Sequence, residues 1–240
     1  MSECVIDKLS KERNISEIYL FGSYARKDND ENSDIDILVV IDDCNEKEYI
    51  SYKECFAKIL HVPVEWISLY RYSKILRMYQ YGSYFLWHIK KEGINLYSRN
   101  NQLEKLLESL PKYKNVRNDL KEYEQIVEDI QHETDESYFD IDYELSVLAS
   151  LVRNTCIAIA YLNGKFDFGR NSVIITCKQI YNNVINFTLE EYTELYKYRL
   201  HQTGKLDSVK AGTKKQVLFW LECEKKLLEI ALEGVDKNER

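Results

Sequence analysis

The stretch LFGSYARKDNDENSDIDILVV, residues 20–40, decides the fold. It begins at the end of one apolar run, residues 18–21, and ends in a second apolar run, residues 35–41. Short runs rich in β-branched and aromatic residues, bounded by Gly, Asp or Asn, are typical of buried strands. The stretch therefore predicts a strand, a turn into a short helix, and a second strand.

Gly22 and Ser23 stand at the end of the first predicted strand. A residue without a side chain lets the backbone approach a ligand closely and turn into a helix. The first amides of a helix attract phosphate groups. Gly22 and Ser23 are therefore predicted to cradle a phosphate.

The segment Ser33-Asp34-Ile35-Asp36 opens the second predicted strand. Two residues that are two apart on a strand project from the same face, roughly 7 Å apart along the backbone. Two carboxylates on an apolar strand repel each other unless cations compensate them, and Mg²⁺ commonly shares one or two carboxylates with substrate phosphates. The alternative is that Asp34 turns the chain and Asp36 faces solvent on an edge strand, but the Gly-Ser turn upstream favours the metal-binding interpretation.

Together these motifs resemble the DNA polymerase β-like nucleotidyltransferase superfamily, whose signature is Gly-Ser followed, after a short helix, by Asp-x-Asp on the next strand. Lys27 departs from the pattern because a glycine often follows the matched Arg26. The resemblance implies transfer of a nucleoside monophosphate from ATP with two Mg²⁺ ions, about 3.5 to 4 Å apart, bound by Asp34 and Asp36. It also assigns Gly22, Ser23 and Arg26 to nucleotide binding.

The family supplies a third carboxylate from a later strand, which the resemblance places at Glu65 in Val64-Glu-Trp-Ile67. Glu65 would bind metal or remove the proton of the acceptor hydroxyl, and the sequence leaves both roles open. The alternative is an exposed strand position. Residues 82–97 look like the closing helix and strand of such a domain, in which His88 is interpreted as packed or exposed and Glu92 as a helix-end residue.

The pattern of the whole chain predicts an α+β fold, with a mixed sheet and helices in a catalytic domain at residues 1–99 and an all-α bundle at residues 100–240. Within the first domain, residues 45–60 show helical spacing and residues 62–69 return to strand character, with Pro63 at the start or edge of that strand. Further helices are predicted at residues 103–110, 121–131, 143–162, 172–184, 189–200 and 214–232. Thr188 and Glu191 have the spacing of a capping box.

The helical part resembles the helical domain of aminoglycoside adenylyltransferases of the spectinomycin and streptomycin type. The resemblance implies that Arg153 and Arg170 close over the triphosphate, and arginine suits this role because its fork binds phosphate oxygens in pairs. Surface ion pairs are the alternative. Asp140 and Asp142, in an acidic and aromatic segment, are predicted acceptor contacts, and helix-capping acids are the alternative.

The composition, with 45% hydrophobic and 30% charged residues, is that of an ordinary globular protein. A formal charge of -7 argues against broad, non-specific binding of nucleic acid, because such binding depends on clustered Lys and Arg. The apolar runs in the strands are too short to span a bilayer, and the first residues lack a basic segment followed by an apolar one, so we expect a cytoplasmic protein without membrane contact. The six scattered cysteines, Cys4 among them, are expected to be buried or incidental thiols.

The leading hypothesis is therefore transfer of AMP from ATP to a hydroxyl of a small molecule, an aminoglycoside-like antibiotic, which would confer antibiotic resistance. Protein AMPylation by a toxin–antitoxin enzyme is one alternative, although such antitoxins are usually a single short domain. A ribonuclease toxin of the HEPN type, which is marked by an Arg followed a few residues later by a His, is disfavoured because Arg199 and His201 are too close together and His132 has no arginine just upstream. The last alternative is a catalytically silent nucleotide-binding module.

Overall fold

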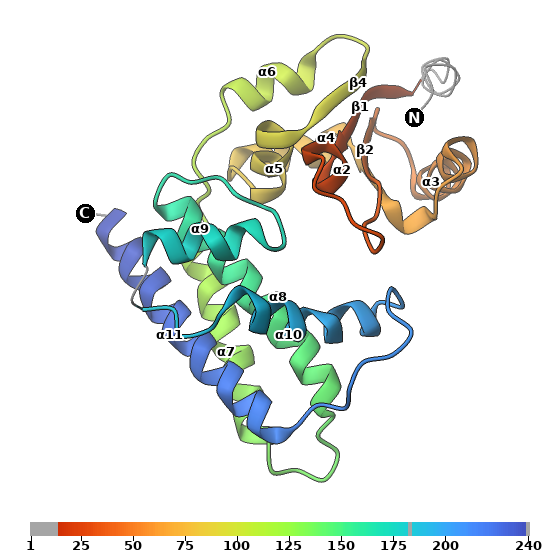
Figure 1. Cartoon of the computed structure of the whole chain (residues 1–240). Helices are drawn as coiled ribbons and strands as arrows, with labels where there is room; N and C mark the ends of the chain where they lie inside the picture. Colours follow the sequence, from red (N-terminus) through yellow and green to blue (C-terminus); the bar gives the residue numbers. More distant parts are fainter. Residues whose placement is uncertain (1–13, 182–183, 239–240) are drawn as a thin grey trace. The chain divides into compact units, whose positions relative to one another are not determined.

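The computed structural model describes residues 14–181 and 184–238 (Figure 1). The chain divides into two compact units, residues 1–114 and 115–240. The first unit is a mixed sheet covered by helices, and the second is helical, as the sequence predicts. Cys4 lies outside the described residues; the other five cysteines are free thiols, and three of them are buried.

The sheet of the first unit has four strands in the order β3-β2-β1-β4. Strand β1 pairs antiparallel with both β2 and β4, whereas β2 and β3 run parallel. The strands are β1 (Ile15–Phe21), β2 (Asp36–Ile41), β3 (Ile67–Arg71) and β4 (Ile94–Ser98). In this register Phe21, the last residue of β1, lies opposite Asp36, the first residue of β2. The predicted sites therefore meet at one end of the two central strands.

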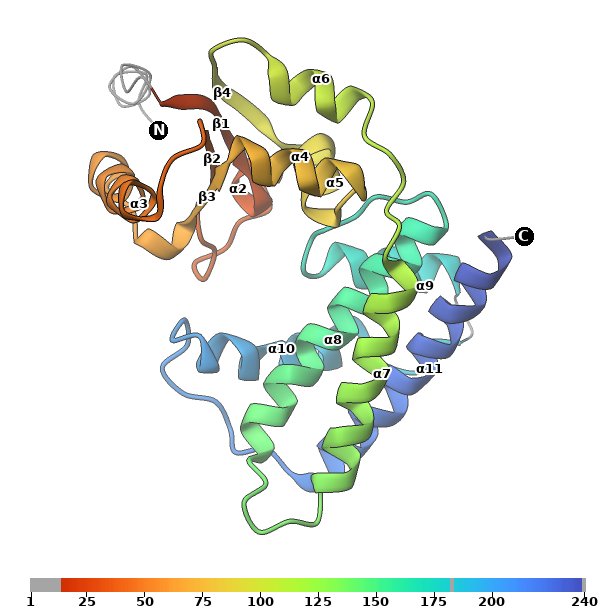
Figure 2. The ribbon, with the colours of Figure 1, turned by 180° about the vertical axis from the view of Figure 1, so that it is seen from behind.

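Helices cover both faces of this sheet (Figures 1 and 2). Alternating side chains of β2 face opposite sides: Ile37 and Val39 pack with α3, whereas Leu38 and Val40 pack with α4, α5 and α6. The helical elements of the unit are α2 (Gly22–Arg26), α3 (Glu46–Leu60), the 3₁₀ turn η1 (Val64–Trp66), α4 (Tyr72–Gln80), α5 (Tyr84–Glu92) and α6 (Gln102–Glu108). Every β2 residue from Ile37 onward is buried, which explains the continuous apolar run in the sequence.

Several elements differ from the sequence-based expectation. Helix α4 was not predicted, and α9 ends at Ile180, before the predicted end at residue 184. Residues 64–66 form the turn η1 instead of the first part of a strand, and β3 begins only at Ile67, after Pro63. Helix α6 belongs to the first unit, although the predicted boundary assigns it to the second. Its Leu103 and Leu107 are buried in the same core as Leu38, and this burial ties the helix to the sheet.

The second unit is built around α8, which contacts each of the other four helices. Its helices are α7 (Val116–Glu133), α8 (Ile141–Leu162), α9 (Ser172–Ile180), α10 (Leu189–Gln202) and α11 (Lys214–Asn238). The predicted capping box is present, because Thr188 accepts from the amide of Glu191 while the Glu191 carboxylate accepts from that of Thr188. By length and composition α8 could cross a membrane, but 67% of its apolar window is buried within the protein, as in a core helix.

Candidate active site at the start of β2

The carboxylate of Asp36 lies directly against the backbone of Gly22. A Cβ atom added to Gly22 would lie 2.0 Å from Oδ2 of Asp36, far inside van der Waals contact. Gly22 also has a φ of +73°, in the left-handed region that side chains disfavour. The turn therefore requires glycine for two independent reasons, and both bring the backbone of α2 next to Asp36.

The other two predicted acids lie near the same end of the sheet, but on irregular backbone. Asp34 is half-buried in the segment that precedes β2, so only Asp36 lies on the strand itself. Glu65 is exposed in η1, two residues before Ile67, which pairs with Ile37 near the start of β2. Pairing of β2 with β3 thus explains why residues thirty positions apart approach one another.

The donors at this end of the sheet fit a shared magnesium ion better than a cage made by the protein alone. In residues 14–181 and 184–238, no three His, Cys, Asp or Glu side chains gather closely enough to enclose a metal ion. Two half-buried carboxylates are nevertheless the set that Mg²⁺ uses when phosphates and water complete its coordination. Asp34 and Asp36 would hold such an ion, and Glu65 remains a predicted third ligand.

Glu92, at the end of α5, is the residue that sequence inspection missed. Its Oε1 accepts hydrogen bonds from the backbone N–H of Gly22 at 3.1 Å, from Nη1 of Arg26 at 2.6 Å, and from the ring of His88. The i,i+4 spacing of His88 and Glu92 on one helix was the available signal. The bond to Gly22, which joins residues 70 positions apart, had no local signal.

These contacts keep Glu92 ionised. Burial by itself would raise the pKa of the Glu92 carboxyl, but the hydrogen bonds and charges of His88 and Arg26 outweigh it and lower that pKa below its ordinary value. Only 7% of the side chain is exposed, so the pair with Arg26 is shielded from solvent. A charged carboxylate therefore stands beside the turn at all pH values near neutrality.

Two of the predicted phosphate ligands have partners within the protein. The amide of Gly22 donates to Glu92, so the predicted cradle at this turn already holds a carboxylate. Arg26 donates to both Asp28 and Glu92. The assignment of Gly22, Ser23 and Arg26 to nucleotide binding stays a prediction.

Lys27 occupies the position where the related families often have glycine, and the structure shows the reason for that preference. It caps α2 with φ 65° and ψ 31°, a left-handed conformation. Such a conformation costs a residue with a Cβ roughly 1–2 kcal/mol, while glycine loses roughly 0.5–1 kcal/mol of unfolded-chain entropy.

We expect Lys27→Gly to raise the free energy of unfolding of the first unit by about 0.5 kcal/mol. Chemical denaturation measures the change. The control is Lys58→Gly, which removes the same side chain from the last turn of α3 and should lower stability by about 1 kcal/mol. If both substitutions destabilise equally, the conformation of Lys27 carries no strain.

In the second unit the structure brings Arg153 and Arg170 together around Tyr192. Arg153, on α8, donates from Nη2 to the carbonyl oxygen of Phe168 at 2.5 Å, and the Arg170 guanidinium lies 5.2 Å from the ring centre of Tyr196. Burial raises the pKa of the Tyr192 hydroxyl, and the charges of both arginines oppose that rise. The two residues thus share one region of the helical unit, and their contact with nucleotide remains a prediction.

Asp140 and Asp142 have structural roles at the start of α8. Asp140 caps the helix by accepting from the amide of Tyr143 at 3.1 Å, and Asp142 accepts from the amide of Gly212 at 2.7 Å. Burial, followed by repulsion from Glu133 and Asp140, raises the pKa of the Glu144 carboxyl. Four acidic side chains, Glu133, Asp140, Asp142 and Glu144, therefore lie near the start of α8.

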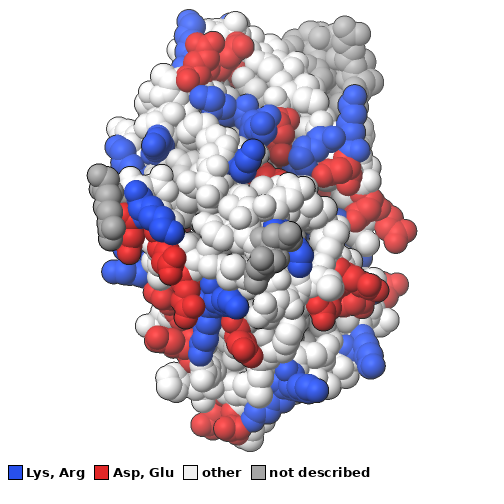
Figure 3. Space-filling model, turned by 60° about the vertical axis from the view of Figure 1, so that its left-hand side comes forward, with Lys and Arg blue, Asp and Glu red and all other residues white. Residues whose placement is uncertain are grey.

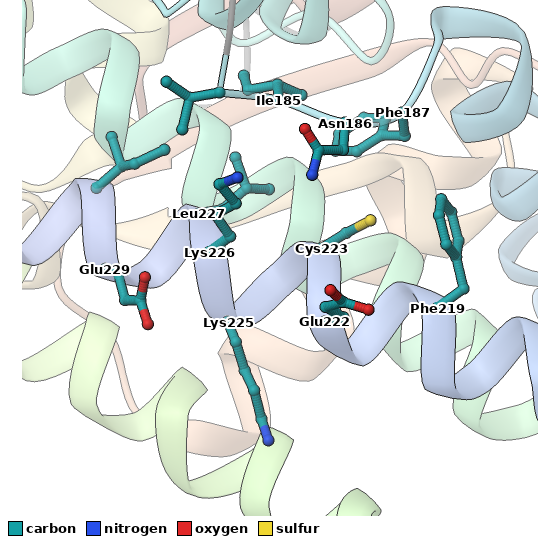
Figure 4. A pocket seen from close by; sticks show the side chains of 12 residues that line it. Ile185, Asn186, Phe187, Phe219, Glu222, Cys223, Lys225, Lys226, Leu227 and Glu229 are labelled. Atoms are coloured by element: carbon teal, nitrogen blue, oxygen red, sulfur yellow. The ribbon is translucent and has the colours of Figure 1, made fainter.

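A cavity of about 380 Å³ lies elsewhere in the helical unit, between α11 and the segment that precedes α10. Figure 4 shows Cys223 pointing towards Asn186 and Phe187, whereas Lys225 points away. The residues that line it include none of the predicted site residues. On the face in Figure 3, acidic and basic side chains are interspersed.

The fold and the glycine turn beside Asp36 are consistent with the nucleotidyltransferase class that the sequence predicts. The family described as Polymerase beta, Nucleotidyltransferase matches residues 3–102. Residues 3–102 therefore match a nucleotidyltransferase domain of the polymerase β type, and a helical region follows them.

Among solved structures, the spectinomycin adenyltransferase AAD(9) from Enterococcus faecialis, with ATP and spectinomycin, is similar in fold. It is 15% identical, with a TM-score of 0.55, and the alignment covers 95% of this chain and 99% of that one. A chain of a toxin–antitoxin structure with AMP-PNP is 21% identical over 55% of this chain and 99% of its own length, but its TM-score of 0.35 is too low to establish a common fold. Among curated proteins, no sequence matches.

Proposed function

We propose that this protein transfers AMP from ATP to a hydroxyl of a small-molecule acceptor, an aminoglycoside-like antibiotic. The observation that carries the proposal is the carboxylate of Asp36, fixed against the Gly22 turn within a nucleotidyltransferase domain. The fold that the chain shares with a spectinomycin adenyltransferase supports the choice of acceptor class. The helical region would contribute substrate-binding residues, Arg153 and Arg170 among them.

The proposed transfer gives each acidic residue of the first unit a separate role. Asp34 and Asp36 would hold Mg²⁺, which when bound neutralises phosphate charge and favours loss of a proton from the acceptor hydroxyl. Glu65, exposed in the turn η1 just before β3, would either complete the metal site or take that proton. Attack of the acceptor oxygen on the α-phosphate would form the new ester bond and release pyrophosphate.

A pyrophosphate-release screen tests this proposal. Purified protein is incubated with Mg²⁺ and each of four NTPs, with spectinomycin, streptomycin, other aminoglycosides and lincosamides as acceptors. We expect release with ATP and at least one aminocyclitol or aminoglycoside, and a product heavier by one AMP in mass spectrometry. NTP binding without release from any acceptor would contradict the proposal and favour a silent binding module. AMP found on a protein would favour AMPylation.

The acidic start of α8 supports a cationic acceptor, because negative potential raises the local concentration of cations. We expect the double substitution Asp140→Asn and Asp142→Asn to raise the KM for the acceptor up to about tenfold, since an exposed charge contact is worth up to about 1 kcal/mol. The KM for ATP should stay unchanged. Asparagine still accepts the two backbone hydrogen bonds, so the helix remains capped.

The matched control replaces two exposed acids of α7, Glu128→Gln with Asp129→Asn, and removes the same amount of charge. Steady-state kinetics at low ionic strength measures both variants. An acceptor KM that is unchanged in the first variant, or raised equally in the second, would remove Asp140 and Asp142 from the acceptor site.

A further inference from the structure

We propose that Glu92 is a positioning residue of the transfer site, which holds the Gly22 turn in place against Asp36. The proposal rests on the transfer activity proposed above. It concerns a residue that lies on α5, outside the signature motifs of residues 20–40. If Glu92 has this role, its loss should make the Gly22 turn less ordered and should lower kcat.

One oxygen of Glu92 binds both ends of α2. Gly22 is the first residue of this five-residue helix and Arg26 is the last, and both donate to Oε1 of Glu92. Helices α2 and α5 lie side by side in Figures 1 and 2, in agreement with their contacts. A helix this short has little stability of its own, so its position depends on such external bonds.

The turn at Gly22 needs an outside contact because its first residue is a glycine. Glycine populates many backbone conformations, and only an outside contact selects one of them. The hydrogen bond from the Gly22 amide to Glu92 fixes the orientation of that peptide group, and the Cα of the same residue is the surface on which Asp36 rests. Loss of the bond would therefore free the backbone against which the Asp36 carboxylate packs.

A second chain of contacts, through His88 and Phe21, connects Glu92 to Asp36. The ring of His88, bonded to Glu92, packs edge-on against Phe21, with ring centres 5.3 Å apart. Phe21 is the residue paired with Asp36 across β1 and β2. The contact through Gly22 therefore reaches the carboxylate of Asp36, and the contact through His88 and Phe21 reaches its backbone.

The charge of Glu92 is balanced locally. A further carboxylate near Asp34 and Asp36 would repel them if it were uncompensated. The Nη1 of Arg26, 2.6 Å from Glu92, supplies the opposite charge. Arg26, which also pairs with Asp28, therefore offsets part of the charge that Glu92 brings to the turn.

The experiment compares Glu92→Ala and Glu92→Gln with Glu108→Ala, a control that removes an exposed glutamate from the end of another helix of the same unit. All variants are full-length and are assayed well below their unfolding temperatures. We expect kcat to fall about 100-fold in Glu92→Ala, the loss typical of a small misplacement of reacting groups, with the KM for ATP within threefold of wild type. Glu92→Gln keeps an acceptor for the Gly22 amide and should lose only about tenfold.

Hydrogen–deuterium exchange of peptides that cover residues 20–27 provides the readout that does not need activity. We expect exchange there to quicken at least tenfold in Glu92→Ala, less in Glu92→Gln, and not at all in Glu108→Ala. Unchanged exchange in both Glu92 variants overturns the proposal, even if kcat falls. Quickened exchange with kcat within threefold of wild type overturns it as well. If wild type transfers nothing, the proposed function fails, while exchange still decides whether Glu92 holds the turn.

Discussion

Asp36→Asn should reduce the rate of pyrophosphate release about 100- to 1,000-fold while leaving the fold intact. The substitution keeps the size of the side chain, so the packing against Gly22 is unchanged. It removes the negative charge that would bind Mg²⁺, and loss of one group that stabilises charge in a transition state costs about 10²–10³ in rate. Turnover is measured at saturating ATP and acceptor, with circular dichroism to verify folding.

Asp42→Asn is the matched control, because Asp42 directly follows β2 at its opposite end. Its carboxylate pairs with Arg99 on the surface, where an ion pair contributes at most about 1 kcal/mol to stability. The control should turn over within twofold of wild type. If Asp36→Asn also keeps activity within tenfold of wild type, the reacting groups lie elsewhere.

The second large effect is expected from Glu224, a carboxyl group fully buried in α11. Thr155 donates to its Oε1 at 2.5 Å, and its Oε2 has no hydrogen-bond partner in the described part of the chain. Burial raises the pKa of Glu224 from its ordinary value of 4.5 to about 8. A buried acid with one neutral donor is more stable protonated than ionised.

The sign of the pH dependence follows from this shift. Below about pH 4.5 the folded and unfolded chains are both protonated at Glu224, and the stability associated with this group is fully present. Between pH 4.5 and 8 only the unfolded chain loses the proton, so the free energy of unfolding falls as pH rises, by up to about 1.4 kcal/mol per pH unit. The total loss should be a few kcal/mol.

Glu224→Gln should abolish this slope and leave the variant more stable than wild type above pH 8. Urea unfolding, followed by far-ultraviolet circular dichroism from pH 4 to 9, measures the difference. Glu222→Gln, at an exposed position two residues earlier on α11, should follow the wild-type curve. Parallel curves for wild type and Glu224→Gln would mean that Glu224 ionises normally in the folded protein.

Local patterns in the sequence predicted the central part of the fold. The apolar run at residues 35–41 corresponds to β2, because nearly all of its side chains are buried, and the Thr188–Glu191 spacing placed the start of α10. Helix α4 and the turn η1 were not predicted. In η1 the β-branched Val64 and the aromatic Trp66 favoured a strand, but the observed 3₁₀ turn ends where pairing with β2 begins.

The candidate site was predictable to the extent that its residues are adjacent in sequence. Gly22 and Asp36 lie within one motif, and the structure places them in contact. The roles of Glu92 and Glu224 depend on partners 70 and 69 residues away, and no spacing rule along the chain reports such contacts. The domain boundary shows the same dependence, because only tertiary packing reveals that α6 belongs with the sheet.

The bond between Gly22 and Glu92 also has a consequence for biosynthesis. A nascent chain on the ribosome contains the glycine turn and both aspartates long before α5 and β4 have been translated. Contacts between distant residues form only after the intervening segment is available and its loop entropy has been overcome. The Gly22 turn therefore gains its hydrogen bond to Glu92 only after α5 has been translated, and a shorter nascent chain contains the motif without this contact.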